Sequence, residues 1–146
     1  MIHRFRVYGT VRGQGRPRMR RNGHAYKDRK DREWEDRIKS AYINSNGPHF
    51  GSKPLIMAAM IHRAMPKSRP KYRESEHDVY RPDVDNIFKA LSDALNGIAY
   101  EDDSQIIAAF PIKLPRVRIE GEYIEVIISD EINMANMLNR VEGLFQ

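Results

Sequence analysis

The pattern of apolar and polar positions along the chain predicts four strands, of which the one at 54–65 is mostly apolar. At residues 2–8, His3, Phe5 and Val7 alternate with basic or exposed side chains, which is typical of a strand with one buried face. Further strands are expected at 54–65, 105–114 and 122–129. In the third of these, one face is expected to carry Ile106, Ala108, Phe110 and Ile112.

Three other segments repeat apolar residues at the spacing of an amphipathic helix. The first covers 28–44, and the second begins near residue 85 and ends at Gly97. The third is expected from about residue 131, with Asp130 as its cap. Strands and helices therefore interleave, which favours an α/β fold of the α+β type: a single domain over 1–146, with one mixed sheet packed by about three α-helices and 131–146 as a C-terminal helical extension.

The composition excludes several classes of protein. The chain has no cysteine, so disulfides, thiolate catalysis and zinc sites built on cysteine are excluded. The longest apolar run has seven residues, from Leu55 to Ile61, whereas a membrane span needs about 20. The N-terminus lacks the pattern of a secretory signal, so we expect no membrane association and a cytoplasmic location.

Charge is distributed unevenly along the chain. The net charge is +5, and residues 1–27 hold eight basic residues and no acid. Residues 74–103 hold nine acids against Arg81 and Lys89. An acidic segment inside a basic protein indicates a site that gathers carboxylates near a surface suited to a polyanion.

Two acidic clusters flank the second helix. Pro82 favours an extended Asp83 with Asp85 capping the helix, an arrangement in which Asp83 and Asp85 would point the same way. Asp102 and Asp103 follow the helix and would approach the first pair if the next strand lies beside the strand before the helix. Converging carboxylates without His or Cys select Mg²⁺, with Mn²⁺ as a possible substitute. Taken singly, the first cluster is more often a helix cap and the second more often a solvated turn.

Basic residues supply the other half of the hypothesis. Lys89 lies one helical turn after Asp85, where it could steady a carboxylate, neutralise a phosphate or donate a proton; an ordinary i, i+4 ion pair is the alternative. Two loops carry side chains suited to DNA phosphates: Arg12, Arg16, Arg18, Arg20, Arg21, Lys67, Arg69, Lys71 and Arg73. A metal site beside such loops predicts a phosphodiesterase acting on nucleic acid. A non-catalytic basic DNA-binding or assembly protein and a small-molecule phosphohydrolase remain alternatives.

The residues from Arg81 to Ile106 carry the pattern P-D-x-D-N-x-x-K-A followed by D-D-x-Q. This pattern resembles the signature of the RusA family of Holliday junction resolvases, small endodeoxyribonucleases of bacterial, phage or prophage origin. The resemblance is close over these 26 residues and looser over the order of the elements. It implies a RusA-like fold and a magnesium-dependent homodimer that makes paired nicks in four-way branched DNA during DNA recombination and repair.

The resemblance also implies roles for individual residues. The essential carboxylates fall on Asp83, Asp85 and Asp103, and the functional lysine falls on Lys89; possible supporting roles fall on Asp102 and Asn86. An arginine run can precede the aspartates in the family, but this chain has Val79-Tyr80-Arg81-Pro82 there. We therefore expect the two basic loops to contact the junction. Dimerisation has a physical reason as well, because a two-fold dimer places one site on each of two equivalent strands.

Overall fold

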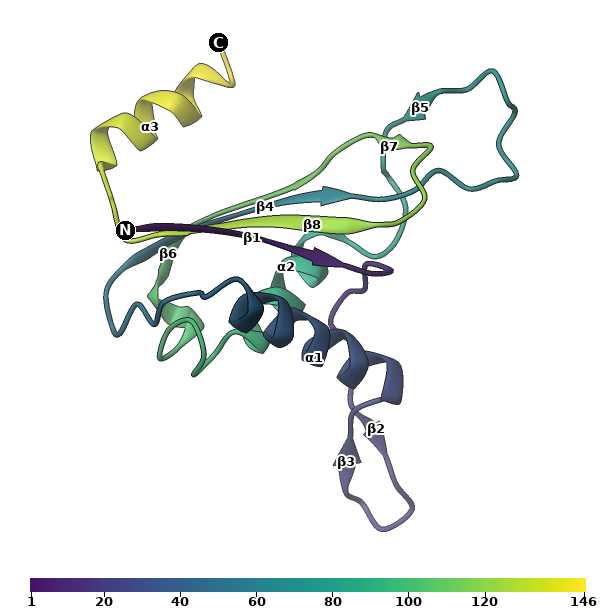
Figure 1. Ribbon diagram of the computed structural model, residues 1–146, viewed down its shortest axis with the longest axis horizontal. Helices are drawn as coiled ribbons and strands as arrows, with labels where there is room; N and C mark the ends of the chain where they lie inside the picture. Colours follow the sequence, from purple (N-terminus) through teal and green to yellow (C-terminus); the bar gives the residue numbers. More distant parts are fainter.

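A four-stranded mixed sheet forms the centre of the computed structural model, which describes residues 1–146 (Figure 1). Its strand order is β1-β8-β4-β6. Strands β1 and β4 both pair antiparallel with β8, whereas β4 and β6 run parallel. The strands are β1 (Ile2–Tyr8), β4 (Leu55–His62), β6 (Ile106–Lys113) and β8 (Tyr123–Ser129). The prediction of one α+β domain with a mixed sheet is confirmed.

Two helices, α1 (Arg29–Asn44) and α2 (Val84–Ala94), cover one face of this sheet (Figure 1). Their apolar stripes supply buried side chains that include Trp34, Ile38 and Ile87. The inward-facing positions of the strands complete a single core, with Val7, Met57, Ala59, Ile61, Ile124, Val126 and Ile128. The periodicity of the sequence predicted both helices and the buried face of β1, and it predicted β4 and β8 as strands without assigning their faces.

Helix α2 connects two parallel neighbouring strands, β4 and β6, and therefore runs back across the sheet between them. Two contacts fix its ends. At its start, Lys113 at the end of β6 donates a hydrogen bond to the carbonyl oxygen of Pro82 (3.1 Å). After its end, Gln105 at the start of β6 donates to the carbonyl oxygen of Lys53, just before β4 (2.8 Å). The residues before α2 therefore lie at the carboxyl ends of strands β4 and β6, and those after α2 lie at the amino ends of the same strands.

The two basic loops contain short pairs of strands. In the first loop, β2 (Arg18–Met19) pairs with β3 (Ala25–Tyr26) in a hairpin that projects from the domain (Figure 1). In the second, β5 (Ser75–Glu76) pairs with β7 (Arg116–Val117), which follows β6. The first basic loop thus forms an arm of exposed residues, whereas the second is tied to the body of the protein.

The face assigned to β6 from the sequence is partly wrong. A register shift lies at the start of the strand, where Leu55 pairs with Ile106 but Ile56 pairs with Ala108. Since directly paired residues project from the same face, Ile106 lies with buried Leu55 on the helix side. The remaining predicted members lie on the opposite face: Ala108, Phe110 and Ile112.

The C-terminal helix α3 (Met134–Gly143) stands apart from the sheet (Figure 1). It buries none of its side chains, and Asn133 caps it through a hydrogen bond from the Asn136 amide (3.1 Å). The predicted cap, Asp130, instead binds the N-terminal amine (2.6 Å) and lies 3.3 Å from Lys53. Only two of the three predicted helices therefore pack on the sheet. None of the helices has the length and hydropathy to span a bilayer.

Candidate active site

The first two candidate carboxylates lie at the start of α2. Asp83 is the N-cap residue, with extended backbone angles (φ −68°, ψ 151°), and its carbonyl oxygen accepts the amide of Ile87 (3.1 Å). Val84 is already helical, so Asp85 lies in the first turn of the helix. The predicted extended conformation of Asp83 is confirmed, and the prediction that Asp85 caps the helix is wrong. The Asp83 side chain makes no capping hydrogen bond. Both carboxylates stay free of protein partners while lying at the positive end of the helix dipole.

Lys89 and Asp93 continue the face that begins with Asp85. The three residues are spaced four apart, on the side of α2 away from the buried stripe of Ile87 and Leu91. None of the three forms an ion pair, in contrast to buried Asp78, which binds Arg63 at 3.0 Å. The face is therefore a row of unpaired charges about 12 Å long, at 1.5 Å per residue.

The second acidic cluster forms a 3-10 turn, η1 (Asp103–Gln105). Asp102 caps this turn: its carboxylate accepts the Ser104 amide (3.2 Å), while the Gln105 side-chain oxygen accepts the Asp102 amide (2.9 Å). The hydrogen bond from Ser104 lowers the pKa of Asp102. The Gln105 side chain also donates to the carbonyl oxygen of Gly51 (2.8 Å), which anchors the turn. Asp102 thus has a structural task, whereas the Asp103 carboxylate has no hydrogen-bond donor of its own.

Asp103 lies beside Asp93, in the last turn of α2. Burial raises the pKa of Asp93, and contact with the Asp103 carboxyl raises it further, while the positive charge of Lys89 partly offsets both effects. Two carboxyl groups in contact repel when both are ionised, so the pair favours a shared proton or a bound cation. Asp93 lies eight residues after Asp85, a spacing that places both carboxylates on the same side of the helix.

The direction of α2 explains why Asp103 meets Asp93. The sequence-based hypothesis required the strand after the helix to lie beside the strand before it, and β6 does lie beside β4. Because these strands are parallel, the segment that enters β6 returns to the edge where α2 ends. The structure therefore gives two neighbourhoods on one helix face, Asp83 with Asp85 and Asp93 with Asp103, with Lys89 between them. The predicted gathering of Asp83, Asp85 and Asp103 around one ion is not found.

The first basic loop packs directly on the start of α2. The Gln14 amide donates to the carbonyl oxygen of Asn86 (3.0 Å). A Cβ atom on Gly13 would lie 3.0 Å from Pro82 and 3.1 Å from Asn86, so the close approach favours glycine. Arg12 leaves this loop to bind Asp31 of α1 (2.9 Å). The main chain of the loop thus places the arginine-rich arm beside the carboxylates.

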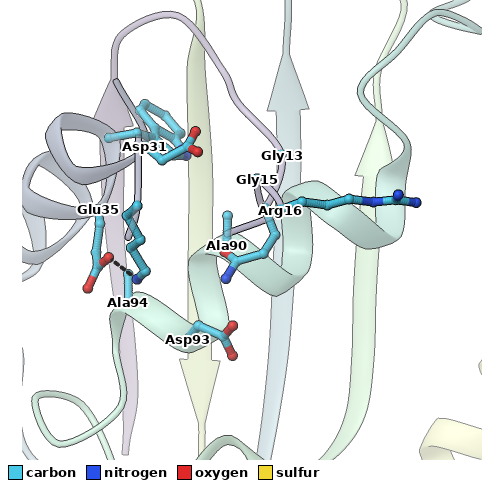
Figure 2. A pocket seen from close by; sticks show the side chains of 11 residues that line it. Gly13, Gly15, Arg16, Asp31, Glu35, Ala90, Asp93 and Ala94 are labelled. Carbon is cyan, nitrogen blue, oxygen red and sulfur yellow. Dashed lines mark hydrogen bonds and ion pairs between the residues drawn. The ribbon is translucent and has the colours of Figure 1, made fainter. Parts of the chain in front are cut away.

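A pocket lies between this loop and the two core helices (Figure 2). Asp31 and Glu35 reach it from α1 and Asp93 from α2, whereas Arg16 lies at its wall with its side chain extending away from these acids (Figure 2). Lys27, just after the β2–β3 hairpin, pairs with Glu35 (2.5 Å) at its wall. The pocket joins the acidic face of α2 to the base of the basic arm.

The predicted DNA contacts divide into free and engaged side chains. Arg16 and Arg21 are exposed and unpaired, and Arg20 lies over the ring of Tyr26, 5.4 Å from its centroid. Arg18 lies 3.7 Å from Asp28, a loose pair that DNA can replace. On the second loop, Lys67 and Lys71 are exposed.

Arg69 and Arg73 belong to the structure of the second loop. Arg69 donates to Glu76 (3.0 Å), stacks over Tyr80 and is only 27% exposed. Arg73 also binds Glu76 (3.4 Å). The sequence could not show that Arg69 is engaged while Lys67 is free. Glu76, the partner of Arg69, is placed beside it by the pairing of β5 with β7.

The donor set fits a hard divalent cation. It consists of carboxylates that form no ion pair, without sulfur or imidazole ligands. Asp83 and Asp85 have no side-chain partner, and Asp93 and Asp103 contact each other. No group of three or more acidic, histidine or cysteine side chains lies close enough to enclose an ion. Mg²⁺ commonly uses one or two protein carboxylates and completes its shell with water and substrate phosphates. Each pair of carboxylates on α2 meets that description.

Comparison with known proteins gives two findings. The family model described as endodeoxyribonuclease RusA matches residues 9–126. The chain is also similar to the uncharacterized protein YqaN of Bacillus subtilis (strain 168), with 32% identity over 145 residues, covering 87% of this chain and 95% of that protein. The family match contains every carboxylate of the α2 face and both basic loops, and it ends before α3.

Proposed function

The chain belongs to the RusA family of endodeoxyribonucleases, whose members resolve Holliday junctions, and we propose that it is a magnesium-dependent nuclease that nicks four-way DNA junctions in recombination and repair. The observation that carries the proposal is the face of α2, where unpaired carboxylates lie beside an exposed arm of arginines. An acidic row of this kind costs stability unless it binds something positive. DNA, which is itself an anion, can approach it only together with cations.

Asp83 and Asp85, at the start of α2, and Asp103, beside Asp93 at its end, are the residues proposed to hold Mg²⁺ at separate positions along the helix face, with Mn²⁺ as a substitute. A divalent ion bound by these carboxylates would supply positive charge beside the scissile phosphate and activation of a water molecule. Asp93 adds a further carboxylate beside Asp103. Asp102 and Asn86 support the site through the backbone, by capping η1 and by receiving the Gln14 amide.

Lys89 is the cation that the chain itself contributes to this face. Its position between Asp85 and Asp93 lets it lie against a phosphate oxygen while both carboxylate pairs remain free. An ammonium group there neutralises charge that develops at phosphorus and can pass a proton to the leaving oxygen through water. These roles distinguish Lys89 from the arginines of the loops, which contact the backbone of the DNA away from the cut.

The DNA is proposed to run across the α2 face and along the β2–β3 hairpin. Arg16, Arg18, Arg20 and Arg21 contact its phosphates from the hairpin, and Arg12 does so once it leaves Asp31. Lys67 and Lys71 extend the contact at the second loop. Contacts of this type position the duplex and carry little sequence information.

A homodimer is proposed as the active form, because a four-way junction presents two equivalent strands related by an approximate two-fold axis. Helix α3 suits the interface. A helix of ten residues with no buried side chain is marginal by itself, and its apolar stripe of Met134, Met137, Leu138 and Val141 needs a partner surface. Packing of this stripe on the second copy would cover it.

The alternative is a non-catalytic protein that binds branched DNA through the same arm. A cleavage assay separates the two: wild type and Asp85→Asn are each incubated with four-way junction, fork and duplex DNA in Mg²⁺. We expect wild type to nick the junction in preference to the other substrates, whereas Asp85→Asn binds the junction but leaves it intact. Equal inertness of both proteins would exclude the nuclease and leave the binding protein.

A further inference from the structure

Lys113 is a nearly buried lysine whose position no sequence pattern marked. It is the last residue of β6 and pairs in register with Ile61, which is fully buried on the helix side of the sheet. Its side chain is only 12% exposed. A buried ammonium group requires hydrogen-bond acceptors, since its desolvation is otherwise costly.

The acceptors of Lys113 are main-chain carbonyl groups that immediately precede Asp83. Its Nζ donates to the carbonyl oxygens of Tyr80 (2.5 Å) and Pro82 (3.1 Å) and lies 3.6 Å from the Asp78 carboxylate. Two of its three donor hydrogens therefore bind main-chain carbonyls, and Asp78 lies at ion-pair distance. The lysine therefore bridges two points of the segment that leads into α2.

A second cation and a buried acid complete the anchor. The Asp78 side chain is fully buried and accepts two hydrogen bonds from Arg63 Nη1 (3.0 and 3.2 Å). Arg63 also donates to the carbonyl oxygen of Tyr80 (3.3 Å). Asp78 offsets part of the positive charge of Lys113 and Arg63, and Glu122 lies 4.0 Å from Arg63 Nε. Both cations hold the same stretch of main chain.

The anchored stretch determines how Asp83 is presented. The carbonyl of Pro82 belongs to the peptide group whose nitrogen is that of Asp83, so a hydrogen bond to that oxygen fixes the plane from which Asp83 projects. The Asp83 side chain has no capping hydrogen bond to hold it. The position of the Asp83 side chain therefore depends on the position of its main chain. The first turn of α2, which carries Asp85, continues directly from that main chain.

We propose that Lys113, supported by Asp78 and Arg63, is a positioning residue for the nuclease reaction, which fixes the main chain at Tyr80 and Pro82 so that Asp83 and Asp85 face the substrate. This inference rests on the proposed function. Lys113 acts through the backbone and contacts neither DNA nor the carboxylates themselves. Groups of this kind, one step removed from metal ligands, typically change affinity or activity 10- to 100-fold when replaced.

A neighbouring network supplies a matched control. Arg116 is also buried, and it donates to the carbonyl oxygen of Ala64 (3.3 Å) and lies 3.6 Å from Glu76. It meets Tyr80 only through the ring, 4.6 Å from the centroid. Arg116→Met therefore removes a buried cation of similar size but leaves both anchored carbonyls bound.

The experiment compares wild type with Lys113→Met, Lys113→Arg and Arg116→Met. Hydrogen exchange of peptides that cover residues 83–88 reports the anchor without any need for activity. Single-turnover cleavage of a four-way junction in Mg²⁺ and the junction Kd report the site. We expect Lys113→Met to speed exchange in these peptides and to slow cleavage about 10- to 100-fold with Kd within about twofold of wild type. Lys113→Arg, which keeps donors to the carbonyls, should recover part of the rate.

Other results would overturn the proposal. The proposal is overturned if Lys113→Met cleaves the junction at the wild-type rate. It is also overturned if Arg116→Met loses as much of the cleavage rate as Lys113→Met, because that would indicate a general loss of stability. If wild type binds junctions but cuts none, the proposed function fails separately. In that case unchanged exchange in Lys113→Met overturns the anchor, and faster exchange confined to that variant supports it.

Discussion

The carboxyl group of Asp103 lies beside that of Asp93, in the last turn of α2, about two helical turns from Asp85. The acidic site is therefore a row along a helix, with a carboxylate pair at each end and Lys89 between them. An elongated site can meet a phosphodiester backbone along its length, whereas a closed cage of ligands would hold an ion away from it.

Neighbouring residues Asp102 and Asp103 should differ sharply when each is replaced by asparagine. Asp103→Asn removes a free carboxylate and should lower junction cleavage by at least about 100-fold, as losses of charge-stabilising groups in active sites commonly do. Asp102→Asn disturbs the cap of η1, so it should lower the melting temperature slightly and retain most of the cleavage rate. Comparable losses of cleavage rate in both variants would contradict a catalytic role for Asp103 and indicate that the η1 turn only maintains the fold.

Mg²⁺ should stabilise the folded protein in the absence of DNA. A ligand at about 100 times its Kd adds about 2.7 kcal/mol to the free energy of unfolding, which corresponds to a rise of several degrees in melting temperature. Asp83→Asn should abolish most of the rise. The measurement is thermal unfolding with and without Mg²⁺, and a shift of equal size in both proteins would place the ion elsewhere.

Asp93→Asn should stabilise the metal-free protein at neutral pH. The pKa of Asp93 is raised in the folded state, so its contribution to stability is present below its ordinary value of 3.8 and is lost as the pH rises through the folded value. In EDTA, Asp93→Asn should therefore melt above wild type at pH 7, and the difference should vanish near pH 3. Asp36→Asn, an exposed position on α1, serves as the control and should show no such trend.

The arginines of the β2–β3 arm should account for much of the salt dependence of DNA binding. Replacing Arg16, Arg20 and Arg21 together by alanine should weaken junction binding and reduce the slope of log K against log salt by up to about 3, near 0.9 per lost phosphate contact. Arg4→Ala with Arg140→Ala removes two exposed arginines from the sheet and α3. The account requires the control protein to keep the wild-type slope in a titration by fluorescence anisotropy.

Helix α3 should hold the dimer together. Leu138→Glu places a charge in the apolar stripe and should shift sedimentation from dimer to monomer at micromolar concentration, while the far-ultraviolet spectrum changes little. Asn139→Glu adds the same charge next to the stripe and should leave the dimer intact. A wild-type protein that sediments as a monomer would contradict the proposed assembly.

The sequence predicted the elements of the sheet and core because their periodicity is local. Trp34, Ile38 and Tyr42 repeat at helical spacing, and the structure buries all three. The start of β6 was misjudged for an equally local reason that leaves no trace in hydrophobicity. A register shift between Ile106 and Ala108 turns the rest of the strand over, and residues of both faces are apolar there.

The arrangement of the candidate site depended on contacts that no spacing reveals. Whether the second cluster met Asp85 or Asp93 was decided by the parallel pairing of β4 and β6. Arg69 has a side chain suited to a DNA phosphate, but in the structure it binds Glu76. Lys113 lies 31 residues from Pro82 in the sequence, and only the folded structure brings the two residues together.

A crystal structure with Mn²⁺ and an uncleaved four-way junction tests the central claim most directly, because anomalous scattering locates the ion without assumptions about its ligands. The account predicts a manganese peak on the exposed face of α2, coordinated by oxygens of Asp83, Asp85 or Asp103 and by a phosphate of the junction. A fully occupied ion bound only at other acids, such as Glu101 or Glu120, with the α2 carboxylates still free beside the DNA, would contradict it.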